Sequence, residues 1–465
     1  MRALRGRLHP GPVAWRRPPR EPLLAALVAL AMLTVVVPVG AQDVSRLCLT
    51  RALVHGRLSN DACLRGNFDR AEYGGHLYSD KAPGLSLLSV PAAEAVRLPP
   101  PPRWEKTGDL RVWTVRLLSG GIASLLVVLL VGRVAEGLAP GKGALTLVTC
   151  GAGTLLGAAA VAGFEHDTAA LFGFGAFLLA WRHRPLAAGL LAGLACLAAY
   201  EAGIVALVVG GYILLGGVRT AGRYLAGLVP GWLLLGAYDW AAFGSPFHLS
   251  YRYVANSYAS AQTAGFFGVH APTLRGIWYT LGGDRGLLPT SPVLVAAVAG
   301  LVLLWRRGHR AEALAAGLVS AGFLLLEFGY FSPYGGDSPG PRFLIPAIPF
   351  AALGLSLAFA EWPRATGALA TLSVLATTVV AGTWPLAVNS AGLGYRESVW
   401  GELVRLVVRG SSARLASWPA RNVLGEFGID PGAALVVCVV AALAALALAT
   451  LRPPFEAPSG VVSAE

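Results

Sequence analysis

LLAALVALAMLTVVVPV, residues Leu23–Val39, is the first of a series of apolar runs that decide the fold class of this chain. It follows an arginine-rich N-terminus and is about as long as a helix that crosses the hydrocarbon core of a bilayer. A signal peptide cleaved near Val39-Gly40-Ala41 is the alternative. Because the run is longer than the apolar core of most signals, and because further runs follow it, we expect a retained first helix that starts in the cytoplasm.

The composition of the whole chain agrees with a membrane protein. Of its 465 residues, 55% are hydrophobic and only 13% are charged, and the mean hydropathy is +0.61. These values are too apolar for a soluble globular protein, so we predict an all-α polytopic integral membrane protein. The net charge of +12 would suggest nucleic acid in a soluble protein. Here many basic residues lie at the ends of apolar runs, where they set orientation, and no nucleic-acid partner is expected.

Apolar runs of spanning length predict a bundle of about 12 transmembrane helices. Every turn that would face the cytoplasm contains arginine or lysine, as the positive-inside rule requires. We therefore expect residues 1–22 to be a basic cytoplasmic N-terminus, 23–451 a transmembrane domain and 452–465 a cytoplasmic tail. Beyond the first run, the predicted spans are Val112–Val134, Gly143–Val161, Asp167–Trp181, Leu186–Ala199, Ala202–Gly217, Ala221–Phe243, Leu288–Trp305, Glu312–Phe331, Phe343–Glu361, Ala365–Ala387 and Ala433–Leu451.

The long loops all fall on the predicted outer side, so the polar chemistry of the chain is concentrated there. The first external loop, residues 41–111, has two segments with helical patterns. In Val44–His55, arginines alternate with apolar residues, which predicts a helix lying on the membrane surface. Leu85–Val96 predicts a second short helix. The other long outer loops are residues 244–287, 332–342 and 388–431.

The cysteines fall into two groups. Cys48 and Cys63 both lie in the first external loop, where a disulfide is an open alternative whose formation depends on the distance between their Cα atoms. Cys150, Cys196 and Cys438 lie in apolar runs, and we expect them to be small buried thiols.

The same loop contains the polar stretch EYGGHLYSDKAPG, residues Glu72–Gly84. It combines Tyr78, Asp80 and Lys81 with glycines that allow tight turns. A lysine in this position would be a suitable point charge for a lipid phosphate. The alternative is a solvated loop in which Asp80 and Lys81 offset each other.

A second polar group, Gln42-Asp43-Val44-Ser45-Arg46, follows the first span directly. A single aspartate at this position is most often a helix N-cap, and Asp43 fits that interpretation. Its position before the predicted surface helix, with the Lys81 stretch further along the same loop, also fits a site at the mouth of the membrane.

These segments resemble the GT-C membrane glycosyltransferases, particularly the bacterial branch related to protein O-mannosyltransferases and the lipid A aminoarabinose transferase. Asp43 and Arg46 resemble the family's first-loop acid and its following arginine, and Tyr78-Ser79-Asp80-Lys81-Ala82-Pro83 resembles its Tyr-x-Glu-Lys-Pro-Pro element. Two later segments are also similar, Tyr279–Pro292, which contains Arg285, and GGDSPGPRFLIPAIPF at Gly335–Phe350, which contains Arg342.

The resemblance implies a GT-C fold and transfer of a sugar, with inversion, from a polyprenyl-phosphate donor to an acceptor outside the cytoplasm. Asp43 would be the catalytic base, and Lys81, Arg46, Arg342 and Tyr78 would bind the donor phosphate. An interfacial anchor is the alternative role for Arg342. The chain departs from the family pattern at Gln42, where the mannosyltransferases have a second acid, and at Asp80 and Ala82. These departures place a family metal site in doubt, and we expect no required cofactor while leaving a divalent metal open.

Glu165-His166-Asp167 lies between two apolar runs on the predicted outer side. Ionisable groups at membrane depth are costly and often functional. His166 and Asp167, together with Asp80 and Arg285, are therefore candidates for lining the site. Asp167 as the cap of the next span is the alternative, and a metal bound by this trio is disfavoured because no second histidine follows at helical spacing.

We therefore predict a glycosyltransferase of the bacterial cell membrane, with its active site on the extracytoplasmic face and with membrane lipid and a glycan, lipid or protein acceptor as partners. A lipid-linked saccharide flippase or transporter is the main alternative, but it would need polar residues throughout the depth of the spans. A noncatalytic membrane scaffold would have no reason to recognise phosphate.

Overall fold

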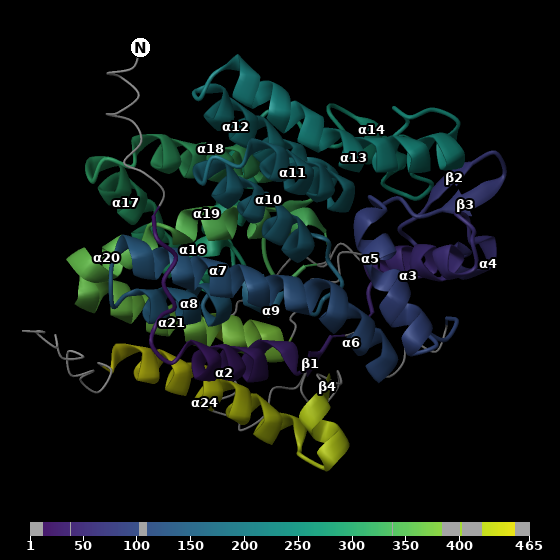
Figure 1. Ribbon diagram of the computed structural model, residues 1–465. Coiled ribbons are helices and arrows are strands. Elements are labelled where there is room, and N and C mark those ends of the chain that lie inside the picture. The colour runs from purple at the N-terminus through teal and green to yellow at the C-terminus, as the bar shows by residue number, and fades with distance from the viewer. Residues whose placement is uncertain are drawn as a thin grey trace, which may run out of the picture.

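A computed structural model describes residues 13–37, 39–101, 109–336, 338–383, 400–401 and 421–451. The described part of the chain is mostly helical, with helices stacked in several directions around one large apolar core (Figure 1). Predictions for the first twelve residues, for most of the 388–431 loop, for the 452–465 tail and for Asp337 lie outside the described residues.

The N-terminal part of the chain contains the predicted first span and the first external loop. Helix α2 (Glu21–Leu33) is followed by the loop elements and then by α6 (Leu110–Arg116), which continues through one π-helical turn into α7 (Ile122–Leu138). The loop elements are the helices α3 (Ala41–Val54), α4 (Asp61–Leu64) and α5 (Gly84–Ala95), with the strands β2 (Ala71–Tyr73) and β3 (His76–Tyr78) between them.

The middle of the chain forms the rest of the helical core and the second group of external elements. The core helices are α8 (Gly143–Ala152), α9 (Leu155–Ala158), α10 (His166–Trp181), α11 (Pro185–Ala198), α12 (Gly203–Leu214) and α13 (Val218–Phe243). Three short helices follow in the next loop, α14 (Ala259–Thr263), α15 (Leu274–Leu281) and α16 (Leu287–Thr290).

The C-terminal part returns to the first helix. Its helices are α17 (Val293–Arg306), α18 (Arg310–Gly329), α19 (Ile348–Ala352), α20 (Leu355–Glu361), α21 (Pro363–Thr383) and α24 (Pro431–Thr450). Helix α24 packs along α2 (Figure 1). Strand β1 (Val35–Val36) pairs antiparallel with β4 (Arg421–Asn422), with Val35 opposite Asn422, so the segment after α2 pairs with the segment before α24.

Small residues allow the core helices to approach closely. Helices α11 and α13 each contain a Gly-x-x-x-Gly pair, Gly189 and Gly193 on one and Gly227 and Gly231 on the other. A Cβ atom on Gly189 would lie 2.0 Å from the Tyr224 carbonyl oxygen, and one on Gly227 would lie 2.1 Å from that of Leu186. Such contacts are typical of helices that associate within a membrane, where close packing replaces the hydrophobic effect.

The structure supports a helical membrane protein and leaves the count of about 12 spans a prediction. Within the described residues, four helices are long and apolar enough to cross a bilayer, covering Leu110–Leu138, Arg310–Gly329, Pro363–Gly382 and Pro431–Thr450. A bent pair, Arg342–Ala352 with Leu355–Glu361, would make a fifth. Several shorter apolar helices, including α2, accompany them.

Three predicted elements differ from the structure. The predicted span Gly143–Val161 is broken, because α8 ends at Ala152 and a turn precedes the short α9. The predicted span Phe343–Glu361 is bent by 53° after Ala352. The helix predicted to lie on the membrane surface, α3, is instead buried inside the protein over most of its length, and its polar residues contact other protein groups.

Candidate functional site

The Asp43 carboxylate lies in the first turn of α3, just after the first span. Its Oδ2 accepts a hydrogen bond from the Gly40 backbone N–H at 3.2 Å and forms an ion pair with Arg116 at 2.7 Å. The predicted N-cap role of Asp43 is therefore wrong, because Gly40 is the N-cap of α3 and Asp43, the third residue of the helix, accepts a hydrogen bond from the N-cap N–H group. Burial raises the pKa of Asp43, while the positive charges of Arg116 and Arg46 act in the opposite direction. The structure therefore gives this carboxylate both a fixed orientation and a proton affinity above that of an exposed aspartate.

Arg116 is a site residue that the sequence analysis missed. It is the last residue of α6, is 3% exposed, and also donates a 2.6 Å hydrogen bond to the Val37 carbonyl oxygen. It thereby links the end of the first span to Asp43. A charged arginine inside an apolar, membrane-spanning helix costs free energy and is therefore often functional. The position of Arg116 in the apolar run after residue 110 is the signal that could have identified it.

Gly163 allows the chain to pass very close to Asp43. Its φ of +73° is in the left-handed region, and a Cβ atom at this position would lie 1.8 Å from Asp43 Oδ1. Only glycine satisfies both conditions at this position. The loop before α10 therefore forms one wall against the carboxylate.

Lys81 lies after the β2–β3 hairpin and is held by two carboxylates. Its Nζ is 2.9 Å from Asp80 Oδ2 and 3.2 Å from Asp69 Oδ2. All three side chains are buried. Asp69 was not predicted, because nothing in its local sequence distinguishes it from other loop aspartates.

The two carboxylates have different surroundings. Asp80 accepts a 2.9 Å hydrogen bond from the Ser45 hydroxyl of α3, and burial raises the pKa of Asp80 despite the adjacent ammonium group. Burial also acts to raise the pKa of Asp69. The Lys81 charge and a hydrogen bond donated by the Tyr258 hydroxyl outweigh that effect and hold the pKa of Asp69 below its usual value.

Arg342 provides a second buried cation. It begins the 3₁₀ turn Arg342–Ala347 and is 5% exposed. Its guanidinium lies 5.0 Å from the centre of the Phe164 ring and 5.5 Å from that of Phe343. In the part of the chain that the structure describes, it forms no ion pair, and its Nε and Nη1 atoms have no hydrogen-bond acceptor. A buried guanidinium in this state is ready to bind an anion.

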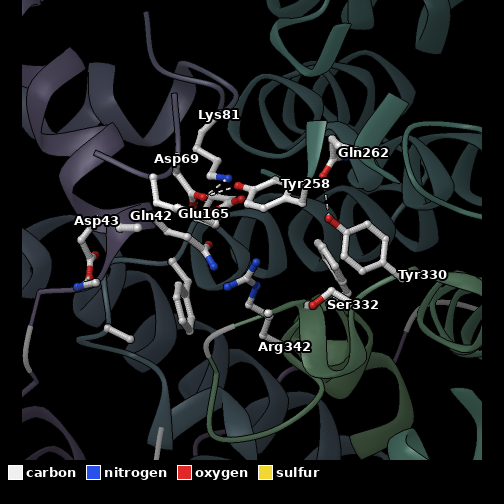
Figure 2. A pocket seen from close by; sticks show the side chains of 18 of the residues that line it. Gln42, Asp43, Asp69, Lys81, Glu165, Tyr258, Gln262, Tyr330, Ser332 and Arg342 are labelled. Carbon is white, nitrogen blue, oxygen red and sulfur yellow. Dashed lines mark hydrogen bonds and ion pairs between the residues drawn. The ribbon is translucent and has the colours of Figure 1, made fainter. Parts of the chain in front are cut away.

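One cavity of about 560 Å³ joins these groups. In Figure 2, Lys81 and Arg342 point toward each other from opposite sides, and Asp43 lies at one end beyond Gln42. The cavity is lined by both polar and apolar side chains. The polar and aromatic ones include Asp69, Glu165, Tyr251, Tyr258, Gln262, Tyr330 and Ser332, and the apolar ones include Val37, Ala41, Ala162, Phe164 and Phe343.

Other predicted residues lie outside the lining of this cavity. Arg46 is buried behind it, where it forms an ion pair with Glu165 and donates to the Gly163 carbonyl oxygen at 3.4 Å. Tyr78 packs against Phe243, with ring centres 5.2 Å apart. The side chains of Asp80, Asp167 and Arg285 are buried, and Asp80 contacts a lining residue, Lys81, through an ion pair.

His166 forms a pair that the sequence did not predict. Its Nδ1 is 2.9 Å from an oxygen of Glu201, which lies in the turn before α12. Glu165, His166 and Glu201 offer three possible ligand atoms within 4.8 Å of one another. The predicted trio with Asp167 is therefore replaced by one with Glu201. A cation there would compete with Arg46 for Glu165, so the donor set fits a metal poorly.

The disulfide that the sequence left open is formed. Cys48 in α3 and Cys63 in α4 are bonded, with their Cα atoms 5.7 Å apart. The cysteines of the apolar runs, at 150, 196 and 438, are buried free thiols as predicted.

No protein-family model and no curated protein matches the sequence. Solved structures do match the fold. The chain superposes on ArnT from Cupriavidus metallidurans bound to undecaprenyl phosphate with a TM-score of 0.54 and 16% sequence identity, over 92% of this chain and 76% of that chain. The apo state of the same protein matches with a TM-score of 0.51 over the same shares of the two chains. The chain therefore shares the fold of this ArnT, which agrees with the fold that the resemblance of its sequence motifs to the GT-C membrane glycosyltransferases predicts.

Proposed function

We propose that this protein transfers a sugar from a polyprenyl-phosphate donor to an acceptor hydroxyl outside the cytoplasm, with inversion at the anomeric carbon. The single observation that carries the proposal is the cavity that joins a buried carboxylate, Asp43, to two cations, Lys81 and Arg342. The crystal structure of ArnT with undecaprenyl phosphate supports a lipid phosphate as the ligand by analogy of fold.

Each group has a role in this reaction. Asp43 takes the proton of the acceptor hydroxyl, and that oxygen forms the new bond to the anomeric carbon. The bond between the anomeric carbon and the phosphate oxygen breaks on the opposite face, and its electron pair stays on the phosphate. Lys81 and Arg342 stabilise the charge that develops there. Arg116 and Gly40 hold the base in place.

The apolar side chains of the cavity suit the lipid part of such a donor, and the polar ones suit a sugar. The aromatic rings of Tyr258 and Tyr330 can stack on a pyranose or furanose ring. Their hydroxyl groups and the amide of Gln262 can bind the hydroxyl groups of the sugar. The Tyr330 hydroxyl donates to the Gln262 side-chain oxygen at 3.0 Å, which fixes the direction of this amide.

The test is a transfer assay with the purified protein, a panel of polyprenyl-phosphate sugars and cell-envelope extract as the acceptor source. Asp43→Asn keeps the shape of the side chain but removes the base, and we expect transfer to fall by about a hundredfold to ten-thousandfold. Glu72→Gln is the matched control, because Glu72 is an exposed acid of the same loop. Full transfer by a correctly inserted Asp43→Asn variant would refute the assignment of the base.

A further inference from the structure

The cation expected to bind the donor is already engaged. Lys81 contacts Asp80 at 2.9 Å and Asp69 at 3.2 Å, and both carboxylates are buried with it. When both acids are ionised, the Lys81 ammonium group and the two carboxylates together carry a net negative charge. A lipid phosphate that approaches Lys81 must therefore displace or share an ammonium group that two carboxylates already hold.

The surroundings offer little further compensation. Arg46 is committed to Glu165, and Arg342, the other cation facing the cavity, would itself bind the arriving phosphate. In the part of the chain that the structure describes, the other titratable groups that interact with the two acids are tyrosines, which are neutral near pH 7. They are Tyr238, Tyr251, Tyr258 and Tyr330.

We propose that Asp69 and Asp80 compete with the donor phosphate for Lys81, so that binding of a phosphodiester lipid in the cavity is coupled to uptake of a proton by this pair of carboxylates. This inference rests on the proposed function. The physical reason is that two carboxylates close together in a buried site cannot both remain ionised once their shared cation turns to another anion.

Asp80 is the member of the pair that takes the proton. It lies deeper, at 1% exposed, and burial raises its pKa in the free protein. Asp69 keeps the hydrogen bond from Tyr258, which favours its ionised form. Protonation of Asp80 removes its negative charge and so weakens its ion pair with Lys81. The Lys81 ammonium group is then free to turn toward the phosphate in the cavity. Asp69 and Asp80 thus act as positioning residues that set the strength and the pH dependence of donor binding.

The experiment is calorimetry of the full chain in lipid nanodiscs, with undecaprenyl methyl phosphate as the probe. This phosphodiester gains no proton of its own near neutral pH, so any proton taken up belongs to the protein. Binding is measured at about pH 7 in Tris and in PIPES, whose enthalpies of ionisation differ. We expect the difference in binding enthalpy to correspond to uptake of up to about one proton per lipid, and Kd to rise by up to about tenfold per pH unit.

Variants then locate the proton. In Asp80→Asn, uptake should fall to near zero while the lipid still binds. Glu72→Gln is the matched control, because it removes an exposed carboxylate of the same loop and leaves Asp69, Asp80 and Lys81 unchanged, and it should retain uptake. Binding with equal enthalpies in both buffers, or undiminished uptake in both Asp80→Asn and Asp69→Asn, overturns the inference alone. Absence of any binding contradicts the proposed function as well. The two-buffer measurement needs only the unmodified protein, so the test stands even if a variant does not fold.

Discussion

The Asp43 carboxylate depends on one buried partner, Arg116, which lies 73 residues further along the chain. Replacement of Arg116 by methionine keeps most of the volume of the side chain and removes its charge. Because that charge opposes the effect of burial, the pKa of Asp43 should rise further in the variant. A base must be ionised to act, so the acidic limb of the pH–rate profile should move to higher pH. Activity should then fall more at pH 6 than at pH 8, measured as kcat/KM over the whole profile.

The control for this experiment is Arg111→Met, at the other end of the same helix. Arg111 is exposed and pairs with Asp109, and exposed pairs of this kind contribute little to stability. We expect its pH profile to match that of the unmodified protein. A uniform loss of activity in Arg116→Met with no displacement of the acidic limb would mean that Arg116 supports the fold without tuning Asp43.

Gly163 should tolerate no side chain. In Gly163→Ala, the new Cβ would overlap Asp43 Oδ1, and the carboxylate or the loop would have to move. A displaced base costs catalysis steeply, so we expect activity to fall by about a hundredfold. The matched control is Gly141→Ala, because Gly141 also has a positive φ of +80° but has no atom within 4 Å of the added Cβ. It separates backbone strain from the collision with Asp43. Equal activities of the two variants would refute the steric explanation.

The external elements α3, α4 and the β2–β3 hairpin form one linked unit that brings Asp43 and Lys81 to the same cavity. The disulfide joins α3 to α4, and the Asn60 backbone N–H donates to the Leu77 carbonyl oxygen of β3 at 3.0 Å. The hairpin then leads directly to Ser79, whose hydroxyl lies 2.9 Å from that of Ser45 in α3. The first external loop is therefore tied back to α3 at two points, by the disulfide and by the contact between Ser79 and Ser45.

Removal of the disulfide should loosen this unit. In a Cys48→Ser, Cys63→Ser double variant, we expect a loss of about 3 kcal/mol in stability, the value for a closed loop of about 15 residues. The measurement is thermal unfolding followed by tryptophan fluorescence, with and without a reductant. A reductant should lower the midpoint for the unmodified protein and leave that of the double variant unchanged. If the reductant affects both proteins equally, the disulfide does not account for the difference.

Sequence reasoning predicted the short-range features of this unit and missed the long-range ones. Asp43 and Lys81 each stand in a recognisable local pattern, and the helices that contain or follow them were expected from periodicity. Asp69 and Glu201 acquire their contacts from residues 12 and 35 positions away, at Lys81 and His166, and no local pattern encodes such pairs. The burial of α3 was also missed, because an arginine that is paired inside a protein looks in sequence like one that faces lipid headgroups.

The arrangement of the whole chain predicts which regions face the outside of the cell. The hairpin that precedes Lys81 and the first turn of α13 should lie on opposite sides of the membrane. His76 and Arg219 are exposed positions in these regions. In whole cells, a membrane-impermeant maleimide should label His76→Cys and should label Arg219→Cys only after the membrane is opened. The three free cysteines of the chain are buried, and they should contribute little background. The reverse pattern would place the cavity on the cytoplasmic side and refute an external active site.

The central claim is that Lys81 and Arg342, from opposite sides of one cavity, bind the same lipid phosphate. The most direct measurement is the affinity for undecaprenyl phosphate of the unmodified protein, of Lys81→Met, of Arg342→Met and of the double variant, with Arg275→Met as the control outside the cavity. We predict that each single change weakens binding by about ten- to a hundredfold, as loss of a charged hydrogen bond does. We also predict that the loss in the double variant differs from the sum of the single losses by more than about 0.5 kcal/mol, because the two cations share one ligand. Strictly additive losses, or affinities equal to that of the control, would contradict the account.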